Sequence, residues 1–207
     1  MKKILIVLTV AATFVSCRNL PDFEDLTLKP IVVTNHDAEA NFSNYQTYYL
    51  PPFIDKIADD ANDSTVSSSL AQPILDAIDN NMQSRGYTKV TDKNLADIGI
   101  GVVTITVTTT EVYYPGYWWG YGGYYGGYGG YYPYYPYYPY SYTYTYTTGS
   151  MVVELIDLKN IDLVNNRVDI LWTNFSNGVL GQGVSSSVLA VDAVNQAFKQ
   201  SPYITTN

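Results

Sequence analysis

The sequence predicts an α+β protein, because it combines segments of strand-like alternation with two segments of helical periodicity. Residues 98–114 and 140–157 read as the two arms of a β-hairpin: Val103, Ile105 and Val107 fall on one face and threonines on the other. Apolar residues recur at helical spacing within residues 69–85 and 186–200. We expect a single domain over residues 30–207 that carries a long insertion at residues 113–146.

The amino terminus has the three-part layout of a secretory signal, with Met-Lys-Lys, an apolar run over residues 4–15 and then Ser16-Cys17. The run is too short to span a membrane. Residues 14–17 resemble a lipobox, although Phe14 stands where leucine is commoner. This predicts a signal peptide at residues 1–16 and a lipid anchor on Cys17. The alternative is an ordinary signal peptide that ends near a chance cysteine.

Residues 17–29 are predicted to be a tether between the lipid and the domain. Arg18 follows the cysteine, so the aspartate that retains enterobacterial lipoproteins in the inner membrane is missing. We therefore expect the outer membrane, on its periplasmic or surface face. Loss of Lys2 and Lys3 with the signal would take the formal charge from −8 to −10. Such an acidic surface repels nucleic acid.

The first elements after the tether are predicted to be strands at residues 31–34 and near 41–50, the second closed by Pro51-Pro52. Residues 59–69 read as a polar loop rather than a calcium loop, because the glycine and glutamate of an EF-hand are missing. The helix 69–85 should end at Gly86. Since proline fits only the first turn of a helix, Pro73 predicts a regular start near Gln72.

Later elements are predicted to be short strands at residues 87–90, 151–158 and 168–172, followed by a final helix over 186–200. Val191, Val194 and Phe198 share one face of that helix, and Pro202 ends it. Trp172 is expected to fill core space.

The insertion holds most of the 22 tyrosines, and no charged residue occurs between Glu111 and Glu154. Its Gly-Gly-Tyr zone should be flexible, its Tyr-Tyr-Pro repeat favours polyproline II, and its Tyr-Thr alternation suits a strand. The insertion is either an irregular loop or a contact surface for sugars, peptides or other aromatic tracts. Self-association is also open, whereas nucleic acid is not expected without cations. The candidate contact residues are Tyr117, Trp118, Trp119, Tyr121, Tyr124 and Tyr125.

The order of several short motifs resembles that of bacterial lipoproteins of the Bacteroidetes type that carry domain of unknown function 4136. The motifs are Asn41-Phe42-Ser43-Asn44-Tyr45, Arg85-Gly86-Tyr87, Ala96-Asp97-Ile98, residues 149–157, Leu171-Trp172 and Ala193-Val194. The resemblance implies an α+β domain with two helices on one face of a mainly antiparallel sheet, tethered in the cell envelope. It implies no enzyme activity, cofactor or catalytic residue.

Groups for catalysis are few. His36 is the only histidine and Cys17 the only cysteine, so neither a nucleophile triad nor a zinc site of His and Cys is expected. Glu154 and Asp157 are three apart on a strand and should point to opposite faces. The glycine run lacks the lysine of a phosphate loop. We therefore expect neither an enzyme nor a metal or cofactor.

Three functions remain at this point. The first is a non-catalytic envelope scaffold or interaction module whose insertion is the contact surface. The second is a lipoprotein that binds glycan or peptidoglycan, with Tyr117, Trp118 and Trp119 stacking on sugar rings. The third is a hydrolase that uses carboxylates such as Asp97 or Asp157.

Overall fold

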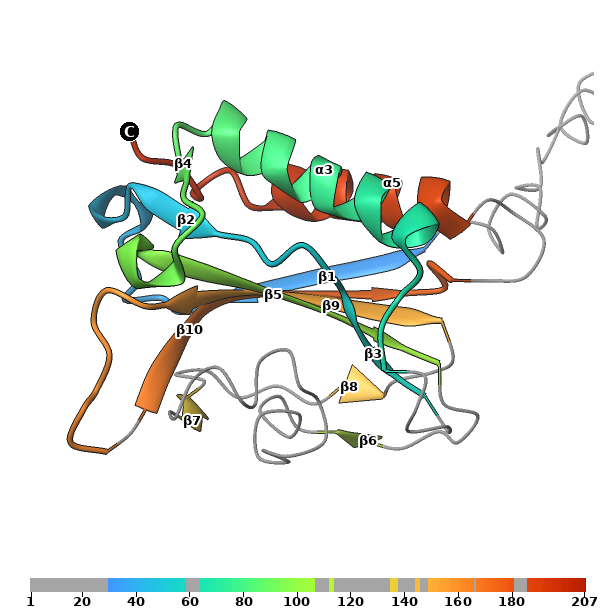
Figure 1. Ribbon diagram of the computed structural model, residues 1–207, viewed down its shortest axis with the longest axis horizontal. Coiled ribbons are helices and arrows are strands. Elements are labelled where there is room, and N and C mark those ends of the chain that lie inside the picture. Colours follow the sequence, from blue (N-terminus) through green and yellow to red (C-terminus); the bar gives the residue numbers. More distant parts are fainter. Residues whose placement is uncertain are drawn as a thin grey trace, which may run out of the picture.

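The computed structural model of the chain describes residues 30–58, 64–106, 112–113, 135–137, 144–145, 149–165, 167–180 and 186–207 (Figure 1). The fold is α+β, with a mixed sheet of seven strands in one layer and two helices that pack together on one of its faces. The sheet strands are β1 (Ile31–His36), β2 (Thr47–Tyr49), β3 (Asp55–Ile57), β4 (Thr88–Lys89), β5 (Ile98–Ile105), β9 (Ser150–Asp157) and β10 (Arg167–Asn177). The helices are α3 (Ser68–Ser84) and α5 (Ser186–Gln200), and the single 3-10 turns are η2 (Phe42–Asn44) and η3 (Lys93–Leu95).

The sheet order is β1-β10-β9-β5-β2-β4, with β3 also paired to β5. The four longest neighbours, β1, β10, β9 and β5, are antiparallel, whereas β2, β3 and β4 join in parallel. The predicted antiparallel pairing therefore holds for the neighbouring strands β1, β10, β9 and β5 only, and the sheet as a whole is mixed. The predicted hairpin is confirmed for residues 98–105 and 150–157, because β5 pairs with β9 from Ile98 opposite Asp157 to Ile105 opposite Ser150; these strands are shorter than the predicted arms 98–114 and 140–157.

The main core lies between the sheet and the helices. Ile100 and Val102 of β5 and Leu155 of β9 face α3 and α5, whose core residues include Ile78 and Phe198. Trp172 is fully buried in this cluster, and its ring centroid lies 5.4 Å from that of Phe198. Its indole N–H donates to Ser201 Oγ at 2.8 Å. The expectation that Trp172 fills core space is confirmed.

Two predicted boundaries change, and one strand was not predicted. Helix α3 begins at Ser68, so the predicted start near Gln72 is wrong: Pro73 lies inside the helix, and the carbonyl left without its N–H belongs to the exposed Ser69. Strand β10 continues past Trp172, since Asn174 pairs with both β1 and β9. Strand β3 was not predicted, because it pairs only through a distant strand.

The insertion contributes three short described strands, β6 (Val112–Tyr113), β7 (Tyr135–Tyr137) and β8 (Tyr144–Thr145). Strands β6 and β8 pair with each other in antiparallel fashion, and β7 pairs in parallel with Arg167–Asp169 of β10. In Figure 1 all three lie on the side of the sheet away from the helices. Within the Tyr-Tyr-Pro repeat, β7 is thus a strand instead of polyproline II; its proline is tolerated because β7 is an edge strand.

The strands of the sheet run between two ends, an entry end and a distal end. The described chain enters at Ile31, opposite Asn177, and the insertion leaves the sheet at Ile105 and Ser150, also at this entry end. The turn at residues 162–165 and the start of β10 lie at the other end, which we call the distal end (Figure 1). Strand β10 has 11 residues, so the ends are separated by roughly 33 Å at about 3.3 Å per residue.

Candidate functional site

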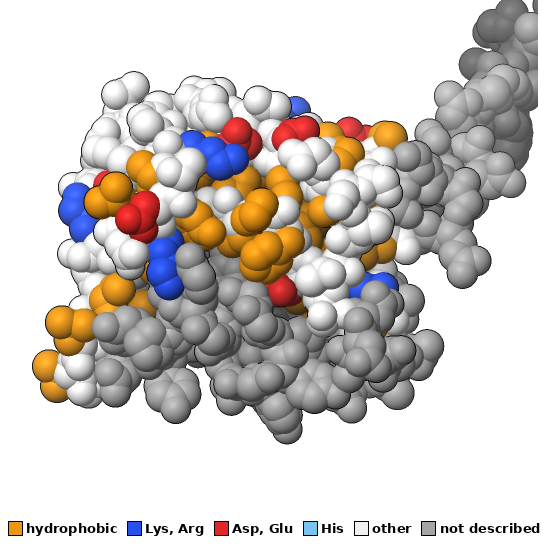
Figure 2. All heavy atoms as spheres, in the orientation of Figure 1, with side chains coloured by type: hydrophobic (Ala, Val, Ile, Leu, Met, Phe, Trp, Pro, Cys, Tyr) orange, Lys and Arg blue, Asp and Glu red, His pale blue; other side chains and the backbone are white. Residues whose placement is uncertain are grey.

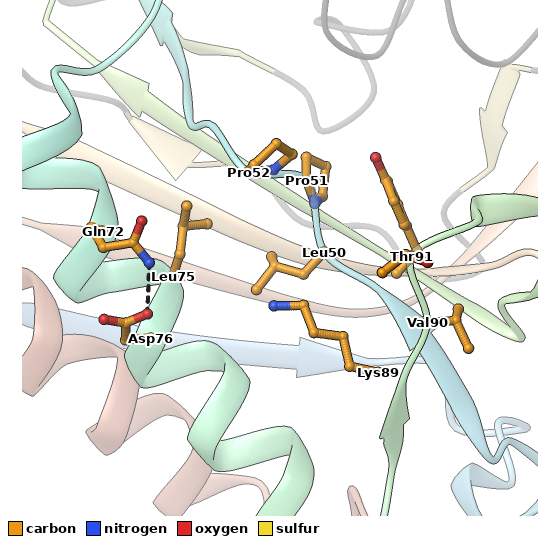
Figure 3. A pocket seen from close by; sticks show the side chains of 10 residues that line it. Leu50, Pro51, Pro52, Gln72, Leu75, Asp76, Lys89, Val90 and Thr91 are labelled. Carbon is orange, nitrogen blue, oxygen red and sulfur yellow. Dashed lines mark hydrogen bonds between the residues drawn. The ribbon is translucent and has the colours of Figure 1, made fainter.

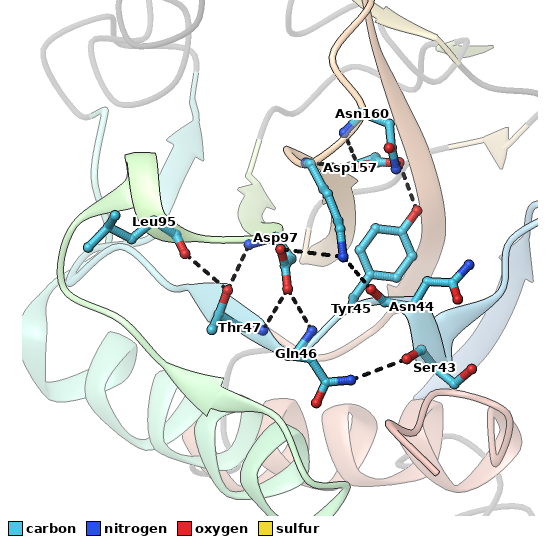
Figure 4. A network of polar contacts seen from close by, with 10 residues as sticks. Ser43, Asn44, Tyr45, Gln46, Thr47, Leu95, Asp97, Asp157 and Asn160 are labelled. Carbon is cyan, nitrogen blue, oxygen red and sulfur yellow. Dashed lines mark hydrogen bonds and ion pairs between the residues drawn. The ribbon is translucent and has the colours of Figure 1, made fainter.

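Asp97 lies in a polar network between η3, β5 and β2 (Figure 4). Its Oδ2 accepts hydrogen bonds from the backbone N–H groups of Gln46 at 2.7 Å and Thr47 at 3.1 Å. The Asp97 N–H in turn donates to Thr47 Oγ1 at 2.9 Å. The carboxylate thus fastens β2 to the start of β5, which is a structural task.

Asp157 is 4% exposed and is held in a similar way at the end of β9. It accepts hydrogen bonds from Tyr45 OH at 2.7 Å, from the N–H groups of Lys159 and Asn160 at 2.9 and 2.8 Å, and from Asn160 Nδ2 at 2.9 Å. Burial, helped by the bond to Asp157, raises the pKa of Tyr45. Because backbone amides and a tyrosine bind the oxygens of Asp97 and Asp157, we do not propose a hydrolase.

A hollow of about 350 Å³ lies between α3, β4 and the connection after β2 (Figure 3). Leu50, Pro51 and Pro52 form one wall, and Figure 2 shows hydrophobic side chains gathered below α3 on this face. Its polar groups are paired within the chain: Gln72 Nε2 donates to Asp76 Oδ1 at 2.7 Å, and Lys89 Nζ lies 3.1 Å from Asp79 Oδ1. The hollow is lined by both polar and apolar side chains, without a nucleophile–base pair in its described lining.

His36 lies beside a second hollow, of about 260 Å³, and its ring stacks on Tyr203 with centroids 4.1 Å apart. This ring stacking is the side-chain contact that the structure shows for His36, the only histidine in the sequence. Among the described residues, no group of three His, Cys, Asp or Glu side chains is placed to hold a metal ion. Neither α3 nor α5 is both long and apolar enough to cross a membrane.

At the distal end, Arg167 fixes β7 to the sheet. Its guanidinium carbon lies 4.1 Å from the ring centroid of Tyr137, a cation–π contact. Arg167 Nε is 3.3 Å from Asp169 Oδ1, and Nη2 is 3.8 Å from Asp162 Oδ2. Burial raises the pKa of Asp169, although Arg167 acts in the opposite direction. The arginine thus links a tyrosine of the insertion to two carboxylates of the domain.

The turn beside Arg167 presents two aliphatic side chains to solvent. Asp162 Oδ1 accepts hydrogen bonds from the N–H groups of Val164 and Asn165, both at 3.0 Å, which closes the turn. Leu163 is 70% exposed and Val164 90%, and Tyr137, which contacts Arg167, is 43% exposed. We call Tyr137, Leu163 and Val164 the distal patch. Sequence reasoning missed Leu163 and Val164; the available signal was two aliphatic residues within a polar turn.

The predicted site residues lie outside the described part of the chain. This holds for Cys17 and for the six aromatic contact candidates, Tyr117, Trp118, Trp119, Tyr121, Tyr124 and Tyr125. Within the insertion, Tyr137 is the residue whose side-chain exposure the structure describes.

Comparisons with known proteins agree on one family. The model of domain of unknown function DUF4136 matches residues 32–203. The chain is also similar to a DUF4136 family protein from Bacteroides thetaiotaomicron VPI-5482, known from a crystal structure. The two share 36% sequence identity with a TM-score of 0.73, over 86% of this chain and 99% of that one. No curated protein matches the sequence.

Proposed function

The chain belongs to the DUF4136 family, and on this premise we propose that it is a non-catalytic, lipid-anchored protein of the cell envelope that acts as an interaction module. The observation that carries the proposal is the distal patch: Tyr137, Leu163 and Val164 expose apolar surface at the end of the sheet away from the chain's entry. Isolated exposed apolar residues are ordinary, but neighbouring ones beside an ordered turn favour a contact site.

The proposed anchor and the patch are arranged for a contact away from the lipid. A tether from Cys17 to Ile31 spans at most about 50 Å when fully extended. The distal patch lies roughly 33 Å beyond the start of β1 along the sheet. The domain would therefore present the patch to an envelope protein, or to a second copy of itself, on the side away from the membrane.

The proposed contact surface combines the distal patch with the aromatic residues of the insertion. Tyrosine and tryptophan offer large rigid surfaces at low cost in side-chain entropy. Tyr117, Trp118, Trp119, Tyr121, Tyr124 and Tyr125 would extend the patch. Cys17 would carry the lipid in the outer membrane.

The test of the contact surface is affinity capture from membranes with Leu163→Ser/Val164→Ser, because both side chains are largely exposed and their loss should leave the fold intact. Val188→Ser is the matched control, since Val188 is a 53% exposed valine on α5. We expect the double variant, and not the control, to lose bound proteins or to change its oligomeric state in light scattering. Unchanged proteins and an unchanged oligomeric state would reject the proposal.

Two further arms separate the alternatives. Loss of a co-purifying glycan from Trp118→Ala/Trp119→Ala, with the bound proteins retained, would favour glycan binding over protein contact. Labelling with a palmitate analogue, compared between the wild type and Cys17→Ser, tests the anchor. We expect label on the wild type only.

A further inference from the structure

The sheet face away from the helices, which we call the opposite face, is largely buried along β5, β9 and β10, whereas Ile31 and Val33 of this face on β1 are 63% and 38% exposed. Side chains alternate along a strand, so the neighbours of the core residues point to this face. Ile105, Val152 and Phe175 of this face are 0%, 3% and 5% exposed. The described residues supply an apolar cluster only toward the distal end, where Ile156, Val168 and Ile170 meet Leu158 and Ile161. The rest of the face needs another cover.

The described parts of the insertion lie on this side of the sheet (Figure 1). The insertion leaves the sheet at the entry end, yet β7 pairs with Arg167–Asp169 at the distal end. Residues 114–134 between β6 and β7 could reach about 70 Å when extended, which is twice the roughly 33 Å between the two ends. The insertion is thus long enough, and attached at both ends, to run along the opposite face.

The surface of the opposite face suits an occupant rich in tyrosine and glycine. Gly99 and Gly101 of β5 are on this face; the Leu158 side chain covers Gly99, at 3.0 Å from where a Cβ would lie, whereas Gly101 adds no side chain beside Glu154. On β9 and β10 the small residues Ser150 and Thr173 of this face are 0% and 1% exposed. Flat aromatic rings can fill the space that such small residues leave, and tyrosine offers them with few torsions to fix.

The opposite face also contains a carboxylate. Glu154 is 4% exposed and lies between Gly101 and Thr173 in the sheet register. A buried carboxylate requires hydrogen-bond donors. The insertion has no cation between residues 112 and 153, but it has many tyrosine hydroxyls. The domain already uses this pairing elsewhere, because Tyr45 donates to Asp157 and Tyr48 to Asp79.

We infer that the opposite face is the docking surface for the chain's own insertion, residues 113–146, with Arg167–Tyr137 as the fixed point and Glu154 as an acceptor for a tyrosine hydroxyl. The insertion then forms a third layer of the domain. One side of the insertion then contacts the sheet, and the other side is available to a partner.

Chymotrypsin tests this inference directly, because it cleaves after aromatic residues and the insertion offers many. The full-length protein is compared with a peptide of residues 113–146 that has charged ends for solubility. A docked segment is cut only when it opens, so we expect cleavage in the protein at least about tenfold slower than in the peptide. Equal rates would overturn the inference.

Arg167→Ala tests the fixed point without disturbing the core, since the arginine side chain is 35% exposed. We expect cleavage within the insertion to speed up about fivefold, the effect of losing one cation–π contact. Lys199→Ala, on the exposed end of α5, is the control and should leave the rate unchanged. An unchanged rate in Arg167→Ala would remove Arg167 as the fixed point.

Dilution distinguishes this inference from docking between two copies. Protection within one chain does not depend on protein concentration, whereas protection by a second copy is lost on dilution. A rate that rises over a hundredfold dilution, about the range that light scattering covers, would overturn the intramolecular form. The dependence of the cleavage rate on dilution is measured without a partner. Its result therefore tests the docking of the insertion separately from the proposed function.

Discussion

Both faces of the sheet are largely buried along β5, β9 and β10, but they are built from different residues. The helix-covered face presents large side chains such as Ile100, Leu155 and Trp172 to two amphipathic helices. The opposite face presents Gly99, Gly101 and Glu154 beside Val152 and Phe175. Large complementary side chains specify how two helices seat. We infer that the opposite face, with its small residues, instead accepts an extended aromatic segment. This difference between the two faces can be measured.

The largest effect is expected on the helix-covered face. Trp172→Ala should lower the free energy of unfolding by about 4 kcal/mol, because it removes a fully buried ring that packs on Phe198. Urea denaturation measures the loss. The same loss is expected in a chain without residues 116–139, since Trp172 packs in the core between the sheet and the helices. A loss under about 1 kcal/mol would contradict the assignment of Trp172 to the main core.

Phe175→Ala addresses the opposite face. In the full chain we expect a loss of about 3 kcal/mol in the free energy of unfolding, the low end for a buried phenylalanine. In the chain without residues 116–139 the ring has lost its inferred cover, so the change should shrink to about 0.5 kcal/mol, as for a surface site. Equal losses in both backgrounds would show that the cover is not the insertion.

The pH dependence of stability provides a further test of the opposite face through Asp55. Asp55 pairs with Val103 on this face and is 5% exposed, and burial raises its pKa to about 6. The native state therefore binds this proton more tightly than the unfolded chain, so stability falls as pH rises from about 4 to about 6 and levels off above that. The expected fall is roughly 3 kcal/mol, from a pKa shift of about two units at about 1.4 kcal/mol each.

Asp55→Asn should remove this fall and raise the free energy of unfolding at pH 7.5, as measured by urea denaturation across the pH range. Asp192→Asn changes an exposed carboxyl on α5 and is expected to retain the wild-type dependence. A variant of Asp55 with the same slope as the wild type would assign the dependence to other groups.

Part of the fold was predictable from sequence. The alternation that includes Val103 and Ile105 predicted β5 as a hairpin arm, although these two side chains lie on the opposite face, and the bounds of α5 follow from the spacing of Val191, Val194 and Phe198. The length of β10 was missed for a physical reason. Asn174 and Ser176 are polar yet fully buried, and Ser176 Oγ donates to Asn174 Oδ1 at 3.1 Å, so the apolar pattern stops before the strand does.

The remaining features depend on contacts between distant segments. The parallel joins of β2 and β3 to β5 leave no local signal. The distal patch required knowledge that Asp162 closes a turn. The position of β7 could not be deduced because nothing in the Tyr-Tyr-Pro repeat indicates which strand it pairs with. The contact that fixes β7 comes from Arg167, which is distant in sequence.

The length of the insertion also affects how the protein folds. Ile105 and Ser150 are the last pair of the β5–β9 hairpin, so the 44 residues 106–149 connect its arms. Closing such a connection costs about 2 kcal/mol more entropy than closing a four-residue turn. Strands β5 and β9 therefore cannot begin as a local hairpin, in contrast to β9 and β10, which residues 158–166 connect. The β5–β9 pairing is a late, long-range event, and a chain with a shortened insertion is expected to fold faster.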